Sequence, residues 1–292
     1  MIPITSLSRF SSVAFGILSS KNDPISLTAF RHSNYAQSMD RASDFLSALP
    51  PLCPGRKRVY LIRHGQTDWN AQGLMQGGGY DIPLNEYGLA QARHVAEALG
   101  GIELDVVASS HLSRASQTAD EVHAIQRRNC RARSLSAAVS PPSRVVMTDF
   151  GEMRFGELEG SAKGGGIREA RSVSQSAERL ERCNKAMAED GHWSWPGPDG
   201  ESAYQVEERA LHGLEELLGN GSDGDRHVAI VSHSRTNKVL LASLLRGDAT
   251  EFSSIEQGNT CINVFDWDED EGKVHGVIVN YLDHAVINDM HP

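Results

Sequence analysis

Hydrophobic and polar positions form two patterns along most of the chain, short apolar runs and longer stretches with apolar residues at helical spacing. Residues 57–63 form an aliphatic, β-branched run that ends abruptly at His64-Gly65, which is typical of a buried parallel strand. Apolar side chains then recur at helical spacing up to Leu99, and two glycines end the helix predicted at 86–99. The same patterns predict further strands at 104–108, 144–148, 227–232, 259–267 and 273–281, and further helices starting at Ser113 and at 168–189, 201–218 and 236–245.

This alternation of strands and helices predicts the fold class. It favours a three-layer α/β/α sandwich with a mostly parallel central sheet. Two of the predicted strands lead directly into a histidine, His64 and His233, and ligands bind at the carboxyl ends of strands in open α/β sheets. Up to about residue 55 the chain is polar, is interrupted by prolines and lacks a sustained period. We therefore expect an N-terminal extension at residues 1–55 and a single domain at residues 56–292.

Composition and charge exclude several classes of protein. The chain has 292 residues, of which 39% are hydrophobic and 23% charged, as is typical of a globular chain. Every apolar run is interrupted before the roughly 18 to 20 residues that a bilayer crossing needs, so no membrane partner is expected. The formal net charge of -10 repels a nucleic acid at long range, and the basic residues form no stripe with aromatic ones. A small anionic ligand would therefore need a local cluster of Arg and His.

The N-terminal segment and the cysteines bear on localisation. The 4 cysteines are far apart in the sequence, which favours a reducing compartment over a disulfide scaffold. The first 22 residues contain no Asp or Glu, are rich in Ser and include Arg9 and Lys21. This composition is typical of a transit peptide for a plastid or mitochondrion, and a disordered tail is the alternative. We expect an organellar protein if the segment is a transit peptide, and a cytoplasmic one otherwise.

One segment carries a specific resemblance. Residues 61–70, LIRHGQTDWN, resemble the signature of the histidine phosphatase superfamily, which has the phosphoglycerate mutase-like fold. An Arg-His-Gly triplet alone is weak evidence, but further matching segments follow in the family's order and extend the resemblance over about residues 56–284. These segments are QGGGYDIPLNEYGLAQA at 76–92, SSHLSRASQTA at 109–119, GEMRFGELEG at 151–160, GPDGES at 197–202 and VSHS at 231–234.

The residues that carry the resemblance suit phosphoryl transfer. A neutral imidazole is a nucleophile whose phosphorylated product is readily hydrolysed, so His64 is the expected nucleophile. The phosphoryl group brings about two negative charges, and the resemblance implies that Arg63 and Arg114 bind it through bidentate hydrogen bonds. The start of the helix that carries Arg114 would also offer backbone N–H groups to the anion. His233 matches the family's second histidine, expected to be protonated and to stabilise the equatorial oxygens. Asn70 matches a neutral phosphate donor, with a turn residue as the alternative.

The leaving alcohol needs a general acid. Glu152 matches the family position for this acid, and the same carboxylate can later activate the attacking water. Its neighbours Asp149, Glu157 and Glu159 remain alternatives. The sequence contains no H-E-x-x-H, no Cys-x-x-Cys pair and no Asp-rich loop of the EF-hand kind, so we expect no metal and no cofactor.

Three functions stay open. The first motif favours a phosphatase that hydrolyses a small phosphorylated metabolite, because the family's mutases usually show H-G-E-S-x-W-N where this chain has HGQTDWN. Phosphoglycerate mutase-type transfer and an inactive binding module of the same fold are the alternatives. Lys163, Arg168 and Arg171, within the segment 161–200, would suit a phosphorylated sugar acid or would simply be solvated. The metabolite and the oligomeric state stay open, with a homodimer as one expectation.

Overall fold

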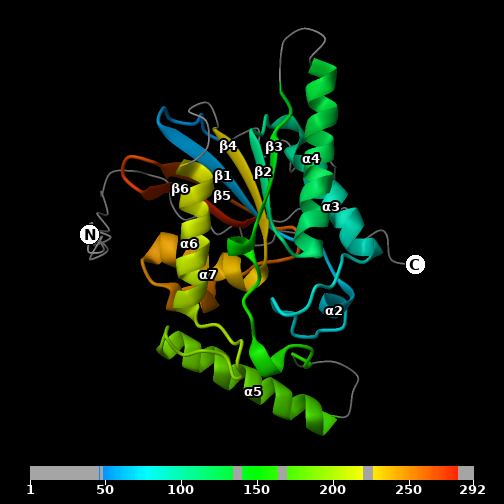
Figure 1. The fold of residues 1–292 in the computed structure, drawn as a ribbon, viewed down its shortest axis with the longest axis vertical. Coiled ribbons are helices and arrows are strands. Elements are labelled where there is room, and N and C mark those ends of the chain that lie inside the picture. The colour runs from blue at the N-terminus through cyan, green and yellow to red at the C-terminus, as the bar shows by residue number, and fades with distance from the viewer. Residues whose placement is uncertain (1–45, 47–48, 134–139, 164–169, 220–225, 282–292) are drawn as a thin grey trace, which may run out of the picture.

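The computed structural model describes residues 46, 49–133, 140–163, 170–219 and 226–281 (Figure 1). The strands are β1 (Arg56–Arg63), β2 (Val106–Ser110), β3 (Ser143–Met147), β4 (His227–Ser232), β5 (Ile262–Asp268) and β6 (Lys273–Tyr281). The α-helices are α2 (Asp68–Ala71), α3 (Glu86–Ala98), α4 (Ser113–Arg133), α5 (Ala170–Glu189), α6 (Ala203–Gly219) and α7 (Ser234–Arg246). Short 3-10 helices are η1 (Leu99–Gly101), η2 (Thr148–Phe150), η3 (Gly156–Leu158) and η4 (Ala249–Ser254).

The strands form a six-stranded sheet in the order β3-β2-β4-β1-β5-β6. The four strands β3, β2, β4 and β1 run parallel, whereas β5 pairs antiparallel with β1 and with β6. The parallel strands are connected through helices, as parallel pairs require. The carboxyl ends of β1, β2 and β4 therefore meet at one edge of the sheet.

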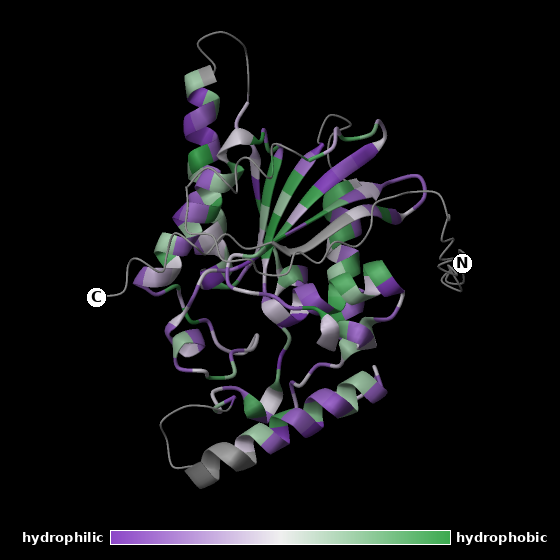
Figure 2. Ribbon diagram, turned by 180° about the vertical axis from the view of Figure 1, so that it is seen from behind, coloured by the Kyte–Doolittle hydropathy of each residue, from purple (hydrophilic) through white to green (hydrophobic). Residues whose placement is uncertain are grey.

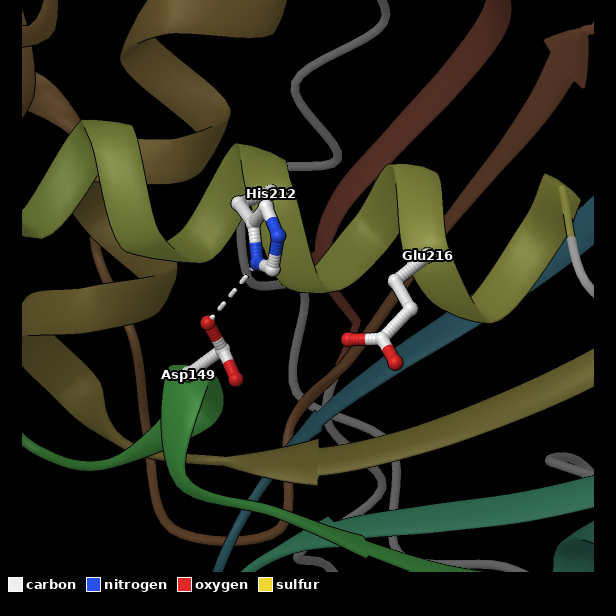
Figure 3. A group of neighbouring side chains, drawn as sticks. All are labelled: Asp149, His212 and Glu216. Carbon is white, nitrogen blue, oxygen red and sulfur yellow. Dashed lines mark hydrogen bonds and ion pairs between the residues drawn. The ribbon is translucent and has the colours of Figure 1, made fainter. Parts of the chain in front are cut away.

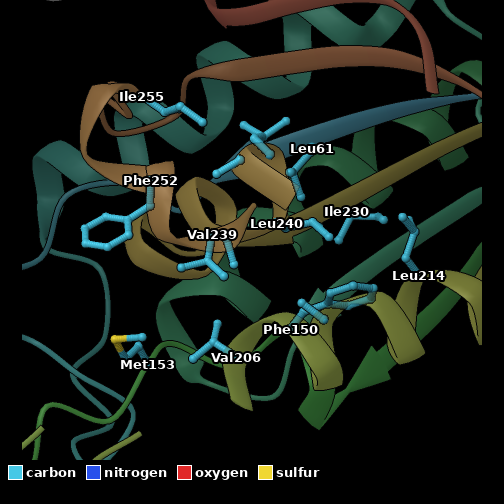
Figure 4. Close-up of a cluster of buried hydrophobic side chains, with 14 of the residues drawn as sticks. Leu61, Phe150, Met153, Val206, Leu214, Ile230, Val239, Leu240, Phe252 and Ile255 are labelled. Carbon is cyan, nitrogen blue, oxygen red and sulfur yellow. The ribbon is translucent and has the colours of Figure 1, made fainter. Parts of the chain in front are cut away.

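Both faces of the sheet are covered, and this explains why its strands read as continuous apolar runs. Successive side chains of a strand point to opposite faces. Val59 and Leu61 pack in a core cluster with α6 and α7, while Tyr60 and Ile62 pack in a second cluster with α3 and α4. Figure 4 shows the first cluster between the sheet and the two helices, and Figure 2 shows that hydrophobic residues are concentrated in the central strands. The predicted three-layer α/β/α sandwich is confirmed.

The helix α5 lies at the end of the molecule, below α2 and α7 in the view of Figure 1. The connection from α5 to α6 is fixed by Trp195, which is buried and donates a hydrogen bond from Nε1 to the sulfur of Met187 on α5 at 3.2 Å. Of the predicted helix at 168–189, the part from Ala170 onward is described.

The segment before β1 contacts the domain. Leu46 is 4% exposed and belongs to the cluster of α3 and α4. Arg58 donates a hydrogen bond to the carbonyl of Pro50 at 2.8 Å, and Arg226 donates to the carbonyls of Leu52 and Cys53 at 3.0 and 3.1 Å. The boundary at residue 55 stays a prediction, and the transit-peptide expectation falls outside the described residues.

Candidate active site

The register of β1 and β4 brings the two histidines together. Arg63 pairs with Ser232 in the parallel ladder, so the next residue of each strand, His64 and His233, leaves the sheet at the same edge. The backbone N–H of His64 donates to the carbonyl of Ser232 at 3.0 Å. The two imidazole rings lie with centroids 5.1 Å apart and planes inclined by 56°. The sequence prediction that both residues serve one site is thus consistent with their placement.

The surroundings of His64 hold it neutral and fix its tautomer. Its side chain is buried, and Nδ1 lies 2.6 Å from the carbonyl oxygen of Gly65. Because a carbonyl only accepts, Nδ1 carries the proton and Nε2 keeps its lone pair. Burial lowers the pKa of His64 well below its ordinary value, and the charges of Arg114 and Arg63 lower it further. The imidazole therefore meets the requirement for a nucleophile.

Arg114 is fully buried at the start of α4, directly after β2. Its guanidinium donates to the carbonyls of Tyr80 and Gly77 at 3.0 and 3.1 Å, and its Nε donates to Nδ1 of His233 at 3.3 Å. Burial lowers the pKa of Arg114 to about 10, while Glu152 acts to raise it. The carbonyls hold the guanidinium in one orientation beside His233.

This contact also fixes the protonation of His233. Nδ1 accepts from Arg114, so the neutral ring carries its proton on Nε2, a buried atom with no hydrogen-bond partner in the described structure. Burial lowers the pKa of His233 well below its ordinary value, and Arg114 and His64 lower it further. The expected protonated form therefore needs the negative charge of a bound phosphoryl group, which would raise the pKa again.

Arg63 provides a second guanidinium at the end of β1. Its Nη1 donates to the carbonyl of Gln257 at 2.8 Å, whereas its buried Nε lacks a partner within the described chain. Burial lowers the pKa of Arg63. Buried donors without partners are costly, by about 1 to 3 kcal/mol each. A bound anion would supply acceptors to the unpaired donors of Arg63 and His233.

Asn70 is linked to the backbone of His64 through Asn259, and its side chain has a structural role. Its Oδ1 accepts from the backbone of Thr67 at 3.3 Å in the capping box of α2, and its Nδ2 donates to Oε1 of Gln76 at 3.2 Å. The alternative interpretation as a turn residue thus describes what the side chain does here. One N–H of the amide remains for a phosphate. Its role as a phosphate donor stays a prediction.

Glu152 is 6% exposed and lies against the N-terminus of α7. Its Oε1 accepts from the backbone N–H groups of Met153 and Thr236 at 2.9 and 3.1 Å and from the Thr236 hydroxyl at 3.3 Å. Its Oε2 accepts a single bond, from the N–H of Arg235 at 3.3 Å. Because His233 is the N-cap of α7, the carboxylate lies within one helical turn of the second histidine. Oε2 is the oxygen with capacity left for a proton or a ligand.

The other acidic candidates are engaged elsewhere. Asp149 accepts from His212 at 3.2 Å, and the exposed Glu157 pairs with Arg179 at 2.9 Å. Glu159 accepts backbone N–H groups from Gly79 and Phe155, and burial raises its pKa. These contacts favour Glu152 among the acids that the sequence left open.

Sequence reasoning missed a pair of residues that fixes the loop of Glu152. Arg209 on α6 donates to the carbonyls of Asp149 and Gly151 at 2.7 and 2.8 Å, and to both carboxylate oxygens of Glu201 at 3.0 and 3.2 Å. Glu201 in turn accepts from the N–H of Arg154 at 2.9 Å. The segment GPDGES, quoted above without an assigned role, was the available signal for Glu201.

One group in the described chain has the composition of a metal site. The ligand atoms of Asp149, His212 and Glu216 lie within 4.8 Å of one another (Figure 3). His212 and Glu216 are exposed and one turn apart on α6. The group does not include any of the six predicted site residues. Among the helices that the structure describes, none is long and apolar enough to span a membrane.

The comparisons with known proteins identify the family. Residues 59–280 match the family model of the histidine phosphatase superfamily (branch 1), and the chain belongs to this superfamily. Over 222 residues it is 28% identical to the uncharacterized phosphatase PhoE of Bacillus subtilis, covering 76% of this chain and 94% of that protein. It is 27% identical to the probable phosphoglycerate mutase GpmB of Salmonella arizonae, covering 80% and 98%.

A solved structure gives the same result. The native mycobacterial glucosyl-3-phosphoglycerate phosphatase aligns with a TM-score of 0.59 at 26% identity, covering 78% of this chain and 100% of that one. The predicted resemblance is confirmed, and the relatives are phosphatases and phosphoglycerate mutases.

Proposed function

We propose that this chain is a phosphatase that hydrolyses a small phosphomonoester through a phosphohistidine intermediate on His64. The observation that carries the proposal is the fixed tautomer of His64. Its Nδ1–H is bound to the Gly65 carbonyl, which leaves the lone pair on Nε2, and the charges of Arg114 and Arg63 act on the ring. A nucleophile held neutral by burial and by positive neighbours is ready to attack a group that those neighbours bind.

In the first step, Nε2 of His64 forms a bond to phosphorus and the ester oxygen leaves with the bonding electrons. Arg63 and Arg114 donate hydrogen bonds to the phosphoryl oxygens, and Nε2–H of His233 donates to another. Glu152 transfers a proton from Oε2 to the departing oxygen, which leaves as an alcohol. This proton transfer contributes about 10² to 10⁴ in rate.

In the second step, water attacks the phosphohistidine. The Glu152 carboxylate accepts a proton from this water as the new P–O bond forms and the P–N bond breaks. Inorganic phosphate leaves, Nε2 of His64 regains its lone pair, and Glu152 is protonated for the next cycle. The substrate oxygen departs as an alcohol and the phosphoryl group passes to water, so atoms and protons balance.

The test is to trap the intermediate. Quenching at alkaline pH during turnover of a ³²P-labelled phosphomonoester should label the peptide with residues 61–70, with a label that is stable in base and labile in acid. The His64→Ala variant should lose the label and nearly all turnover. His192→Ala, which removes an exposed histidine outside the site, should retain both. A label on Ser or Asp, or full turnover by His64→Ala, would contradict the proposal.

A mutase is the second candidate, favoured by the match to a probable phosphoglycerate mutase. It would return the phosphoryl group from His64 to the product rather than to water. Incubation with 3-phosphoglycerate and a trace of 2,3-bisphosphoglycerate distinguishes the two, because a mutase forms 2-phosphoglycerate and a phosphatase releases inorganic phosphate. An inactive binding module would form neither product and no labelled histidine.

A further inference from the structure

Arg235 is a cation beside the site with no assigned function. It lies in the first turn of α7, two residues after His233, and its backbone N–H is bound to Glu152. Its guanidinium carbon lies 4.7, 5.4 and 5.7 Å from three aromatic ring centroids. These rings, Phe252, Phe155 and Trp195, come from separate segments of the chain. The fold has thus placed the side chain of Arg235 by tertiary packing.

Within the described residues, no ion pair neutralises the charge of Arg235. Nη2 donates to the neutral amide oxygen of Asn184 at 2.8 Å, and Nη1 is buried without a partner in the described part of the chain. Burial lowers the pKa of Arg235 to about 10, and Glu152 is the carboxylate that acts against this. Aromatic rings stabilise a guanidinium but satisfy none of its N–H groups. The unpaired Nη1 therefore calls for an acceptor that the described chain does not provide.

A further cation, Lys238, lies about one helical turn after Arg235 on α7. Its pKa is lowered by burial and by the charges of Arg235 and Arg63, while Glu256 and Glu152 act in the opposite direction. Glu152 is thus shared by a group of cations that is larger than one carboxylate can neutralise. The phosphoryl group at His64 would engage Arg63, and positive charge would remain around Arg235.

We propose that Arg235 binds a second anionic group of the substrate, a carboxylate or a second phosphate, while the first phosphate lies at His64. This inference rests on the proposed function, because it assumes that the phosphoryl group binds between Arg63 and Arg114. It gives Arg235 the role of a specificity-determining residue. The substrate class is then a phosphomonoester whose alcohol part carries its own negative charge.

The experiment compares three ligands with the same three-carbon skeleton. Glycerol 3-phosphate has a neutral tail, 3-phosphoglycerate carries a carboxylate, and glycerol 1,3-bisphosphate carries a second phosphate. We expect the wild-type chain to have a kcat/KM for at least one charged ligand about tenfold to a hundredfold above that for glycerol 3-phosphate, as one charge-assisted hydrogen bond would give. The preferred ligand identifies the anion.

The variants then assign the preference. The preference is the ratio of kcat/KM for the preferred charged ligand to kcat/KM for glycerol 3-phosphate. In Arg235→Gln, which keeps a polar side chain near Asn184, this ratio should fall about tenfold or more, while kcat/KM for glycerol 3-phosphate changes little. Arg235→Lys should restore part of the preference. The control is Arg246→Gln, which removes the same charge from the exposed end of α7, eleven residues and about 16 Å further along the helix. This control should keep the full preference.

Binding to the inactive His64→Ala variant separates the two proposals. Dissociation constants for the three ligands, measured by calorimetry with and without Arg235→Gln, should show the same preference and the same loss. If turnover is absent but this pattern appears, the proposed function fails and the second-anion site stands. If the ratios of charged to neutral ligand are equal in wild type and Arg235→Gln, Arg235 has a structural role only and the inference is wrong.

Discussion

The contacts of Arg209 predict that one residue outside the phosphate site controls both stability and the position of Glu152. Arg209 makes four hydrogen bonds, two to the Glu201 carboxylate and two to the carbonyls of Asp149 and Gly151 in the loop before Glu152. The side chains of Arg209 and Glu201 are 21% and 8% exposed. In Arg209→Met, the side chain keeps an apolar stem and loses all of these hydrogen-bond donors.

The expected loss in the free energy of unfolding follows from the Glu201 carboxylate, which Arg209→Met leaves without its ion-pair partner. Removing one partner of a buried ion pair costs about 3 to 5 kcal/mol. Arg209 is partly exposed, and Glu201 keeps its bond from the N–H of Arg154, so we take the lower end, about 3 kcal/mol. For a domain of this size that corresponds to a fall in Tm of about 6 to 12 °C. Displacement of Glu152 by about 1 Å would lower kcat about 10²-fold.

The assay is a double-mutant cycle in thermal and denaturant unfolding, with kcat measured on the same proteins. Glu201→Gln keeps the shape of the partner but removes its charge and one of its two acceptor oxygens, so Arg209→Met should cost less in its presence than in the wild type. The control Arg246→Met breaks an exposed pair with Glu251 at 3.0 Å and should cost about 0 to 1 kcal/mol. Additive losses, or an Arg209→Met no less stable than this control, would refute the reasoning.

Four further outcomes are expected. Stability should fall as the pH is lowered from about 7 to 5, because His64 and His233 have lowered pKa values in the folded state and the unfolded chain therefore binds more protons. Each histidine can contribute up to about 1.4 kcal/mol per pH unit. If the free energy of unfolding of His64→Asn depends on pH as steeply as that of the wild type, this prediction is wrong. Glu152→Gln should slow the first step of alkyl phosphate hydrolysis by about 10² or more. The first step with p-nitrophenyl phosphate should slow much less, because p-nitrophenolate needs little protonation. Stopped-flow release of the alcohol part measures both rates. Deletion of residues 1–44 should leave Tm unchanged, whereas deletion of 1–55 should cost about 2 kcal/mol through loss of buried Leu46, as unfolding curves would show. Phosphate release should survive exhaustive treatment with EDTA, and rescue by a divalent ion after inactivation would overturn that expectation.

The part of the site that follows from strand ends could be predicted from the sequence. A short apolar run that stops at a histidine marks both His64 and His233, and parallel pairing then brings the two ends to one edge of the sheet. The residues before these histidines, Arg63 and Ser232, turn out to be partners in the ladder. Local patterns are sufficient here because strand direction alone fixes where these residues emerge.

Contacts between distant segments could not be predicted in this way. Arg235 sits among rings from residues 155, 195 and 252, and no periodicity in the sequence brings these positions together. The contacts of Arg209 could not be predicted for the same reason, because two of its partners are backbone carbonyl groups, which every residue possesses. The motif predicts that the amide of Asn70 is a phosphate donor. Its contacts in the capping box depend on the short helix that follows Thr67.

N–H groups at two helix N-termini of the site are bound to carboxylates, so in the proposed reaction the phosphate charge is met by side chains. The sequence suggested that the start of α4 would offer N–H groups to the anion, but the N–H and hydroxyl of Ser113 donate to the Asp81 carboxylate, each at 2.7 Å. At α7 the N–H groups of Arg235 and Thr236 are taken by Glu152. Each carboxylate occupies the position at which a helix would otherwise attract an anion. In the proposed reaction the phosphoryl group is therefore bound by guanidinium and imidazole donors, and the helix start at α7 binds Glu152, the proposed general acid.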